Sequence, residues 1–216
     1  MPMFITAVLI AATGIIYRQP IFTLIPLFVS LVVNFLQSNV NRYAYLLGGL
    51  NSLIYAAVYI FFLKLYASAA SAVFVSFTIQ IATYILWKKK PVGNATVFRK
   101  FTNLQRAGIA AVLVVVWLAV YFVISKTDAN NSILDVTSTV LGTFVTIITL
   151  FAYIEYAPLM IVSALISLTL NCKIALADPG YITYIIYSLY CLYCQIKAFI
   201  RVNVLWKEQN KIEKIQ

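Results

Sequence analysis

Apolar segments long enough to cross a lipid bilayer as helices recur along the whole of this 216-residue chain. Most are roughly 17 to 25 residues long, the length that a helix needs to span the hydrocarbon core of a membrane. Charged residues make up only 10% of the chain, against about 25% in a soluble domain. So few charges cannot cover the surface of a soluble protein. The sequence therefore predicts an all-α polytopic membrane protein surrounded by the lipid bilayer.

The apolar pattern predicts seven core transmembrane helices after a shorter N-terminal apolar helix at 3–17. The core helices are expected at 20–38, 43–63, 67–87, 107–125, 133–153, 157–176 and 180–201. A basic loop and a short connector set the fourth helix apart, which groups the helices as three, one and three. The predicted units are an N-terminal segment (1–19), a first three-helix bundle (20–90), a basic loop and linker helix (91–132), a second three-helix bundle (133–201) and a charged cytoplasmic tail (202–216).

The formal net charge of +10 comes largely from two groups of lysines and arginines. One group lies in loop 88–106 and the other in the C-terminal end from Lys197 onward. Four predicted helices separate the groups, so both can lie in the cytoplasm, as the positive-inside rule requires. Cations at helix ends and in loops account for the charge without a nucleic-acid partner. We expect a multi-pass inner-membrane protein with a cytoplasmic C-terminus.

Catalytic and metal-binding patterns are weak in this sequence. It contains no histidine, and Cys191-x-x-Cys194 is a single pair with no second pair to complete a metal site. No nucleotide-hydrolysis or hydrolase motif is present. We therefore expect no enzyme activity, metal or cofactor. Mid-membrane carboxylates, which would suit proton or sodium coupling, are not predicted. The charged residues nearest the membrane fall at predicted helix ends and are Asp135, Glu155, Lys173 and Asp178.

Polar and aromatic side chains form stripes along several predicted helices. Within FTIQIATYILWKKK, residues 77–90, they recur at spacings of three, four and seven, which share one helix face. Such stripes either join helix to helix or line a solute path. A carboxamide costs on the order of several kcal/mol when buried unpaired in hydrocarbon, so Gln80 and Asn51 favour the solute path. The candidate substrate-binding residues are Asn51, Tyr55, Gln80, Tyr84, Trp87, Thr143, Tyr156, Met160, Ser163 and Tyr187.

Tyrosine is abundant, with 15 residues, many of them at the middle of predicted helices. Tyrosine in membrane proteins ordinarily lies at the two membrane interfaces, so mid-helix positions need another explanation. Aromatic rings stack on flat solutes, while amides and hydroxyls bond to the polar edges of those solutes. The stripes therefore predict a path for a small heteroaromatic, polyhydroxylated solute.

The segment 48–87 resembles the second and third core helices of the PnuC family of bacterial vitamin transporters. Residues 135–187 resemble the second bundle of that family. The resemblance implies a seven-helix, pseudo-symmetric 3+1+3 fold, related in shape to the SWEET sugar transporters. It also implies uptake of nicotinamide riboside, thiamine or riboflavin by facilitated diffusion, with a cytoplasmic kinase trapping the product. The residues that carry it are Leu53-x-Tyr55-Ala56, Lys64-Leu65-Tyr66 and Gln80-x-x-x-Tyr84-x-x-Trp87.

The sixth core helix departs from the pattern of the family members that carry nicotinamide riboside. Those members have W-x-x-W where this chain has Glu155-Tyr156-Ala157-Pro158-Leu159-Met160. The substrate therefore stays open within the vitamin and nucleoside class. The alternatives are a SWEET-like sugar transporter and the substrate-capturing membrane subunit of an energy-coupled vitamin importer. A homo-oligomer is compatible with this composition.

Overall fold

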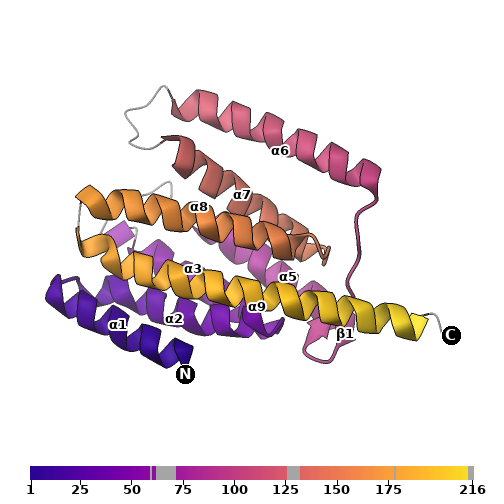
Figure 1. Ribbon diagram of the computed structural model, residues 1–216, viewed down its shortest axis with the longest axis horizontal. Coiled ribbons are helices and arrows are strands. Elements are labelled where there is room, and N and C mark those ends of the chain that lie inside the picture. Colours follow the sequence, from indigo (N-terminus) through magenta and orange to yellow (C-terminus); the bar gives the residue numbers. More distant parts are fainter. Residues whose placement is uncertain (59, 62–71, 126–131, 178, 214–216) are drawn as a thin grey trace.

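The computed structural model describes residues 1–58, 60–61, 72–125, 132–177 and 179–213, which form helices and one small hairpin (Figure 1). The first half contains α1 (Pro2–Ile16), α2 (Ile21–Ser38), α3 (Tyr43–Val58), the π-helical turn η2 (Ala72–Phe77), α5 (Thr78–Lys89), β1 (Pro91–Val92) and β2 (Ala95–Thr96). The second half contains α6 (Asn103–Ile124), α7 (Ser132–Leu150), α8 (Tyr156–Ala177), the 3-10 turn η3 (Pro179–Tyr181) and α9 (Ile182–Glu213).

The prediction of an all-helical membrane protein is confirmed. Among the described residues, four helices are long and apolar enough to cross a membrane, namely Ile21–Ser38, Asn103–Val123, Tyr156–Leu176 and Pro179–Lys211. The apolar helices Pro2–Ile16, Tyr43–Val58 and Val136–Leu150 are shorter. The 3+1+3 grouping stays a prediction. Lys64-Leu65-Tyr66, Asp178 and most of connector 126–132 lie outside the described residues.

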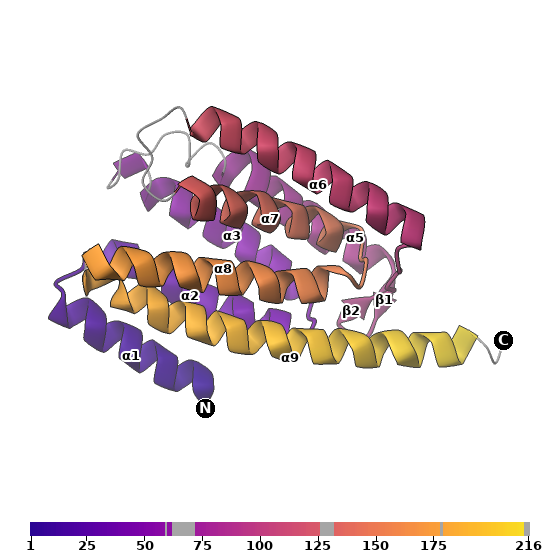
Figure 2. The same ribbon diagram turned by 45° about the horizontal axis from the view of Figure 1, so that its top comes forward.

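Two groups of helices pack along their lengths (Figures 1 and 2). In the first group, α3 contacts both α2 and α5, and in the second, α8 contacts both α7 and α9. The groups meet where α2 packs on α9 and where α5 packs on α7. The N-terminal helix α1 lies against α2 and α9, where its Thr13 Oγ1 accepts a hydrogen bond of 3.0 Å from Thr183 Oγ1. The interface between the groups runs the length of the molecule.

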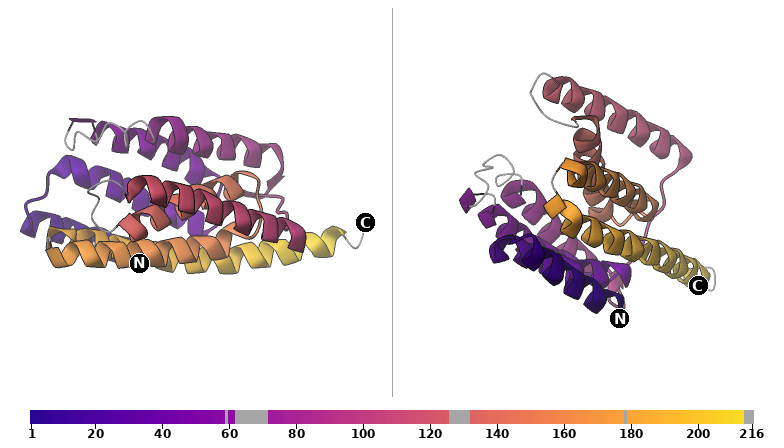
Figure 3. Two further views of the ribbon diagram at one scale, coloured as in Figure 1. Left: turned by 90° about the horizontal axis from the view of Figure 1, so that it is seen from above. Right: turned by 60° about the vertical axis from the view of Figure 1, so that its left-hand side comes forward.

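Helix α6 lies at the periphery, along the upper edge of Figure 1 and of the right-hand view of Figure 3. A capping box begins it: Thr102 Oγ1 accepts from Gln105 N at 3.3 Å, and Gln105 Oε1 accepts from Thr102 N at 2.9 Å. None of its span is buried within the protein, which explains why its sequence is apolar on all sides. One polar contact fastens it to α7, where Trp117 Nε1 donates to Thr137 Oγ1 at 2.9 Å. Helix α6 therefore faces lipid rather than the interface between the two groups.

Helix α9 is longer than the sequence indicated. We predicted that the seventh core helix ends at 201 and is followed by a solvated charged tail, but the helix continues to Glu213. The reason is packing and hydrogen bonding beyond the predicted end. Val202 and Leu205 are buried, and Gln209 Oε1 accepts a hydrogen bond of 3.0 Å from Phe98 N. The end of α9 is thus part of the folded protein.

The hairpin and the segment after it, residues 91–102, cover the end of the molecule at which the basic residues gather, hereafter the basic end. Gln209 Nε2 donates to Thr96 O at 3.0 Å, and Arg42 N donates to Asn94 O at 2.9 Å. On the far side, Arg99 N donates to Ala152 O at 2.9 Å, while Arg99 O accepts from Ile154 N at 2.9 Å. Residues 91–102 therefore connect both helix groups at the basic end.

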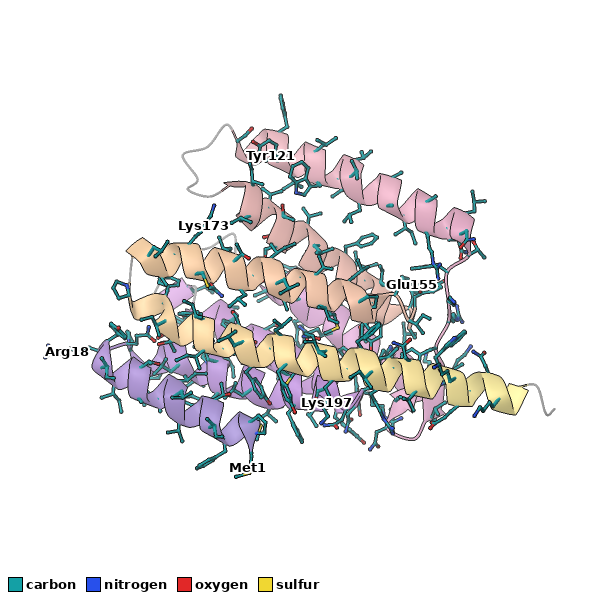
Figure 4. All side chains as sticks on the ribbon, in the orientation of Figure 1. Met1, Arg18, Tyr121, Glu155, Lys173 and Lys197 are labelled. Atoms are coloured by element: carbon teal, nitrogen blue, oxygen red, sulfur yellow. The ribbon has the colours of Figure 1, made fainter. Side chains whose placement is uncertain are left out.

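Glu155 anchors this segment at the turn between α7 and α8 (Figure 4). Its Oε1 atom accepts from Arg106 Nη2 at 2.9 Å, from Arg106 Nε at 3.2 Å and from Phe101 N at 3.1 Å. Glu155→Gln keeps an acceptor for Phe101 N but loses the charge, so we expect a loss of about 1 kcal/mol of stability. Glu155→Ala leaves Phe101 N unpartnered and should lose roughly 1 to 3 kcal/mol.

Unfolding of the purified protein in mixed detergent measures the stability of the two Glu155 variants. Glu208→Gln, at an exposed position on α9, is the matched control and should leave stability within about 0.5 kcal/mol of the unchanged protein. Equal stability of Glu155→Ala and Glu208→Gln would contradict the role given to Glu155.

Candidate functional site

A first cavity of about 240 Å³ lies between the two helix groups. It is lined from α2, α3 and α5 on one side and from α7, α8 and α9 on the other. Gln37 near the end of α2 and Thr149 near the end of α7 place it toward the basic end, and Thr83 lines it from the middle of α5. The other polar side chains in its lining are Ser30, Asn34, Tyr45, Asn51, Ser52, Tyr55, Gln80, Thr146 and Tyr187.

A second cavity of about 450 Å³ adjoins the first. The two share Tyr55, Val145, Met160 and Tyr187 as lining residues, so they follow one another along the interface between the helix groups. Asn171, near the far end of α8, places the second cavity toward the end opposite the basic end. The described residues that line the two cavities contribute amides, hydroxyls, a thiol and tyrosine rings, and none of them is a lysine, arginine, aspartate or glutamate.

Gln80 occupies a place on α5 that the sequence of α3 makes room for. A methyl group at Gly48 would overlap Gln80 Oε1, so only a glycine there allows the amide to lie against α3. Gln80 Nε2 donates to Ser52 Oγ at 3.4 Å, which is a long and weak hydrogen bond. The amide of Gln80 is thus held in the first cavity by packing more than by hydrogen bonding. It keeps capacity to bind another group.

Asn51 has one half of its amide occupied and the other half without a partner. Its Nδ2 atom donates to Ser30 Oγ at 2.8 Å and to Pro26 O at 3.1 Å. Its Oδ1 atom is buried and has no hydrogen-bond partner among the described residues. Gln195 Oε1, which belongs to a residue lining the second cavity, is buried and unpartnered in the same way. A buried acceptor without a donor costs about 1 to 3 kcal/mol, which a ligand with N–H or O–H donors would offset.

Asn34 joins the two helix groups between the cavities. Its Nδ2 atom donates to Tyr187 OH at 3.0 Å, and its Oδ1 atom accepts from Cys191 Sγ and from Gln195 Nε2, each at 3.4 Å. Sequence reasoning missed this residue because it did not treat the first core helix as carrying a stripe. Ser30, Asn34 and Gln37 nevertheless recur at i, i+4 and i+7, and that spacing is the signal that would have found them.

A group of aromatic side chains closes the first cavity toward the basic end and is called the plug here. It consists of Tyr45, Trp87, Phe98 and Tyr156. Trp87 lies at the centre of the plug, only 1% exposed, and its Nε1 atom donates to Thr149 O at 3.0 Å. Its ring centroid lies 4.8 Å from that of Tyr45, 5.7 Å from Phe98 and 6.3 Å from Tyr156. The plug therefore combines both helix groups with the segment 91–102.

Known proteins resemble this chain in sequence and in structure. The family model described as nicotinamide mononucleotide transporter matches residues 20–203. The chain belongs to the nicotinamide mononucleotide transporter family. Its structure is similar to the crystal structure of the vitamin B3 transporter PnuC, with a TM-score of 0.77, 16% sequence identity, and coverage of 95% of this chain and 90% of that chain. No curated protein gives a significant match. The predicted family is confirmed, and it is a family of membrane transporters, not of enzymes.

Six of the ten candidate residues line the cavities of this transporter. Asn51 and Gln80 line the first cavity, Ser163 lines the second, and Tyr55, Met160 and Tyr187 line both. These residues come from α3, α5, α8 and α9. The structure therefore brings together side chains that are more than a hundred positions apart in the sequence. Their contact with a substrate stays a prediction.

The other four candidates lie outside both cavities. Trp87 and Tyr156 are buried in the plug, and Tyr84 packs beside it with its ring centroid 5.7 Å from that of Tyr43. Thr143 is exposed on the outer face of α7. Two of them lie farther along their helices than the lining residues do: Trp87 lies seven residues beyond Gln80, a rise of about 10 Å toward the basic end. Tyr156 likewise lies one turn beyond Met160 toward the same end, a rise of about 6 Å.

Proposed function

We propose that this transporter carries an unphosphorylated heteroaromatic vitamin or nucleoside through the two adjoining cavities by facilitated diffusion. The observation that carries the proposal is a pair of adjoining cavities whose described lining residues come from both helix groups and include amides, hydroxyls and tyrosine rings but no charged side chain. Nicotinamide riboside is the substrate we favour, because the similar solved structure is that of a vitamin B3 transporter. Thiamine and riboflavin belong to the same class of flat, polar solutes and are the natural competitors.

The unpartnered amide oxygens suit the donors of such a substrate. A carboxamide N–H or a ribose hydroxyl can donate to Asn51 Oδ1 in the first cavity and to Gln195 Oε1 in the second. Gln80 offers an amide to the same solute. The rings of Tyr55 and Tyr187 border both cavities and are placed to stack on a heteroaromatic ring.

The absence of charge in the lining argues against a phosphorylated substrate. A phosphate brought into these cavities would lose its hydration, and none of the described lining residues carries a positive charge to replace it. Within the part of the chain that the structure describes, the lining also has no carboxylate that could carry a coupled proton or sodium ion. Facilitated diffusion of the form without a phosphate is therefore the mode of transport that we favour. A cytoplasmic kinase would then trap the product.

Transport requires the plug to open on one side while the opposite end closes. Trp87 donates to the carbonyl of Thr149 across the contact between α5 and α7, so separation of these helices would expose the first cavity to the basic end. Alternating exposure of one site by movement of two helix groups is a common transport mechanism. We place the basic end in the cytoplasm by the positive-inside rule.

Thermal unfolding in the presence of a vitamin and nucleoside panel tests the substrate class. A ligand at a hundred times its dissociation constant should stabilise the protein by about 2.7 kcal/mol. We expect nicotinamide riboside to stabilise and its 5′-phosphate, nicotinamide mononucleotide, to give a dissociation constant at least roughly 100-fold higher, because its phosphate has no charged partner. Equal binding of the two would contradict the proposed specificity.

Proteoliposomes loaded with buffer alone test the mode of transport. We expect the purified protein to equilibrate the stabilising ligand across the membrane without ATP or an ion gradient. Binding without any uptake would instead indicate a substrate-capturing subunit of a larger importer. Competition by glucose but not by the vitamins would indicate a sugar transporter.

A further inference from the structure

A third pocket, of about 230 Å³, lies on the outer surface at the basic end, apart from the two transport cavities. The end of α5, the end of α7 and the segment after β2 form its walls. Three cationic residues, Lys89, Lys90 and Arg99, line it, and none of the described lining residues is acidic. Among the described residues the one ion pair joins Arg106 and Glu155, so these three cations have no carboxylate partner there.

The pocket is also amphipathic, with apolar side chains beside the cations. Leu86, Phe151 and Val97 contribute to its lining and are 40%, 53% and 45% exposed, respectively. In a membrane-spanning protein, apolar side chains with this exposure next to a helix end face the lipid acyl chains, while the lysines reach the headgroup layer. A pocket with a cationic part and an apolar part at this depth fits an amphiphile better than a small soluble anion.

The walls of the pocket are fixed by backbone contacts. Lys90 O accepts from Val97 N at 3.2 Å and from Thr96 Oγ1 at 3.0 Å, and Arg99 N donates to Ala152 O at 2.9 Å. The cationic segment is therefore tied both to α5 and to the turn after α7. A ligand here would meet a backbone that is already fixed at Lys90 and Arg99, which lowers the cost of ordering the site.

We propose that this pocket is a binding site for the headgroup of an anionic phospholipid, with Lys89, Lys90 and Arg99 contacting its phosphate and Leu86 and Phe151 contacting its upper acyl chain. Basic pockets between helices at the charged face of a membrane protein are a recurring form of such sites. Trp87 lies at the back of this pocket and at the centre of the plug. A bound lipid would therefore hold the segment 91–102 against the closed plug.

Thermal unfolding of the detergent-purified protein with added phosphatidylglycerol tests the proposal. Each cation near an anionic lipid strengthens binding roughly fivefold, so Lys89→Gln/Lys90→Gln/Arg99→Gln should raise the half-stabilising lipid concentration by on the order of 100-fold. The matched control removes three exposed cations from α9, Arg201→Gln/Lys207→Gln/Lys211→Gln, and should change that concentration less than about threefold. Phosphatidylcholine should affect the thermal stability of the pocket variant, the α9 control and the unchanged protein to the same extent.

Two further arms separate lipid from other sources of the effect. Phe151→Ser removes an exposed apolar contact without changing charge, and we expect it to weaken phosphatidylglycerol binding. Inorganic phosphate should give no stabilisation at concentrations where the lipid saturates. The proposal is overturned if the α9 control loses as much affinity as the pocket variant, if the pocket variant behaves as the unchanged protein does, or if inorganic phosphate reproduces the lipid effect.

Discussion

Replacement of Trp87 by alanine is expected to lower the free energy of unfolding by about 3 to 5 kcal/mol, the largest stability effect we predict for a single substitution in this protein. The indole is 1% exposed and packs on Tyr45, Phe98 and Tyr156, so its removal leaves a cavity where both helix groups meet. Its hydrogen bond to Thr149 O is lost as well. Unfolding in mixed detergent measures the effect.

Two variants make this prediction specific to the plug. Trp87→Phe keeps most of the ring packing and loses the hydrogen bond, so it should lower stability by only about 1 kcal/mol. Trp117→Ala removes an indole of the same size from peripheral helix α6, where it donates a hydrogen bond to Thr137, and should have a clearly smaller effect than Trp87→Ala. If Trp87→Ala and Trp117→Ala destabilise the protein equally, the plug is not the structural element we describe.

Gln80→Leu should weaken binding of the stabilising ligand by roughly 10- to 100-fold while leaving the fold intact. The substitution removes the amide but keeps a side chain of similar size beside Gly48. The hydrogen bond from Gln80 Nε2 to Ser52 Oγ is long, 3.4 Å. Its loss should therefore lower the stability of the unliganded protein only slightly. Ligand titration by calorimetry, with thermal unfolding of the unliganded protein alongside, measures both quantities.

Thr143→Val is the control that separates the cavities from the sequence stripes. Thr143 shares helical periodicity with other polar residues but is exposed on α7, so we expect its replacement to leave affinity unchanged. Loss of binding in Thr143→Val, with full binding retained in Gln80→Leu, would show that the substrate does not occupy the first cavity.

Composition and periodicity were sufficient to predict the helical membrane fold, because the thickness of the bilayer sets the length of each apolar segment that crosses it. The same reasoning failed at the end of α9. Its last turns are charged on one face, yet buried Val202 and Leu205 and the bonds of Gln209 to residues 91–102 keep them helical. Those contacts are between residues more than a hundred positions apart, and periodicity along one helix does not reveal them.

The candidate site was predicted only in part, and the limit is again what helical spacing can report. Helical spacing reports which side chains share a face, and it correctly grouped Gln80 with the interface between the helix groups. It does not report depth in the membrane, so Trp87 and Tyr156 were assigned to the substrate although they lie in the plug below the first cavity. Spacing along α2 does group Asn34 with Ser30 and Gln37, but it cannot report the bonds of Asn34 to Tyr187 and Gln195 on another helix, from which its importance comes.

A structure of the protein bound to the panel ligand that stabilises it most is the most direct measurement of substrate placement. We predict density for the ligand between the two helix groups, within hydrogen-bond reach of Asn51 Oδ1 or Gln80 and with its ring against Tyr55 or Tyr187. Ligand density elsewhere, with both cavities empty or filled only by water, would contradict the account.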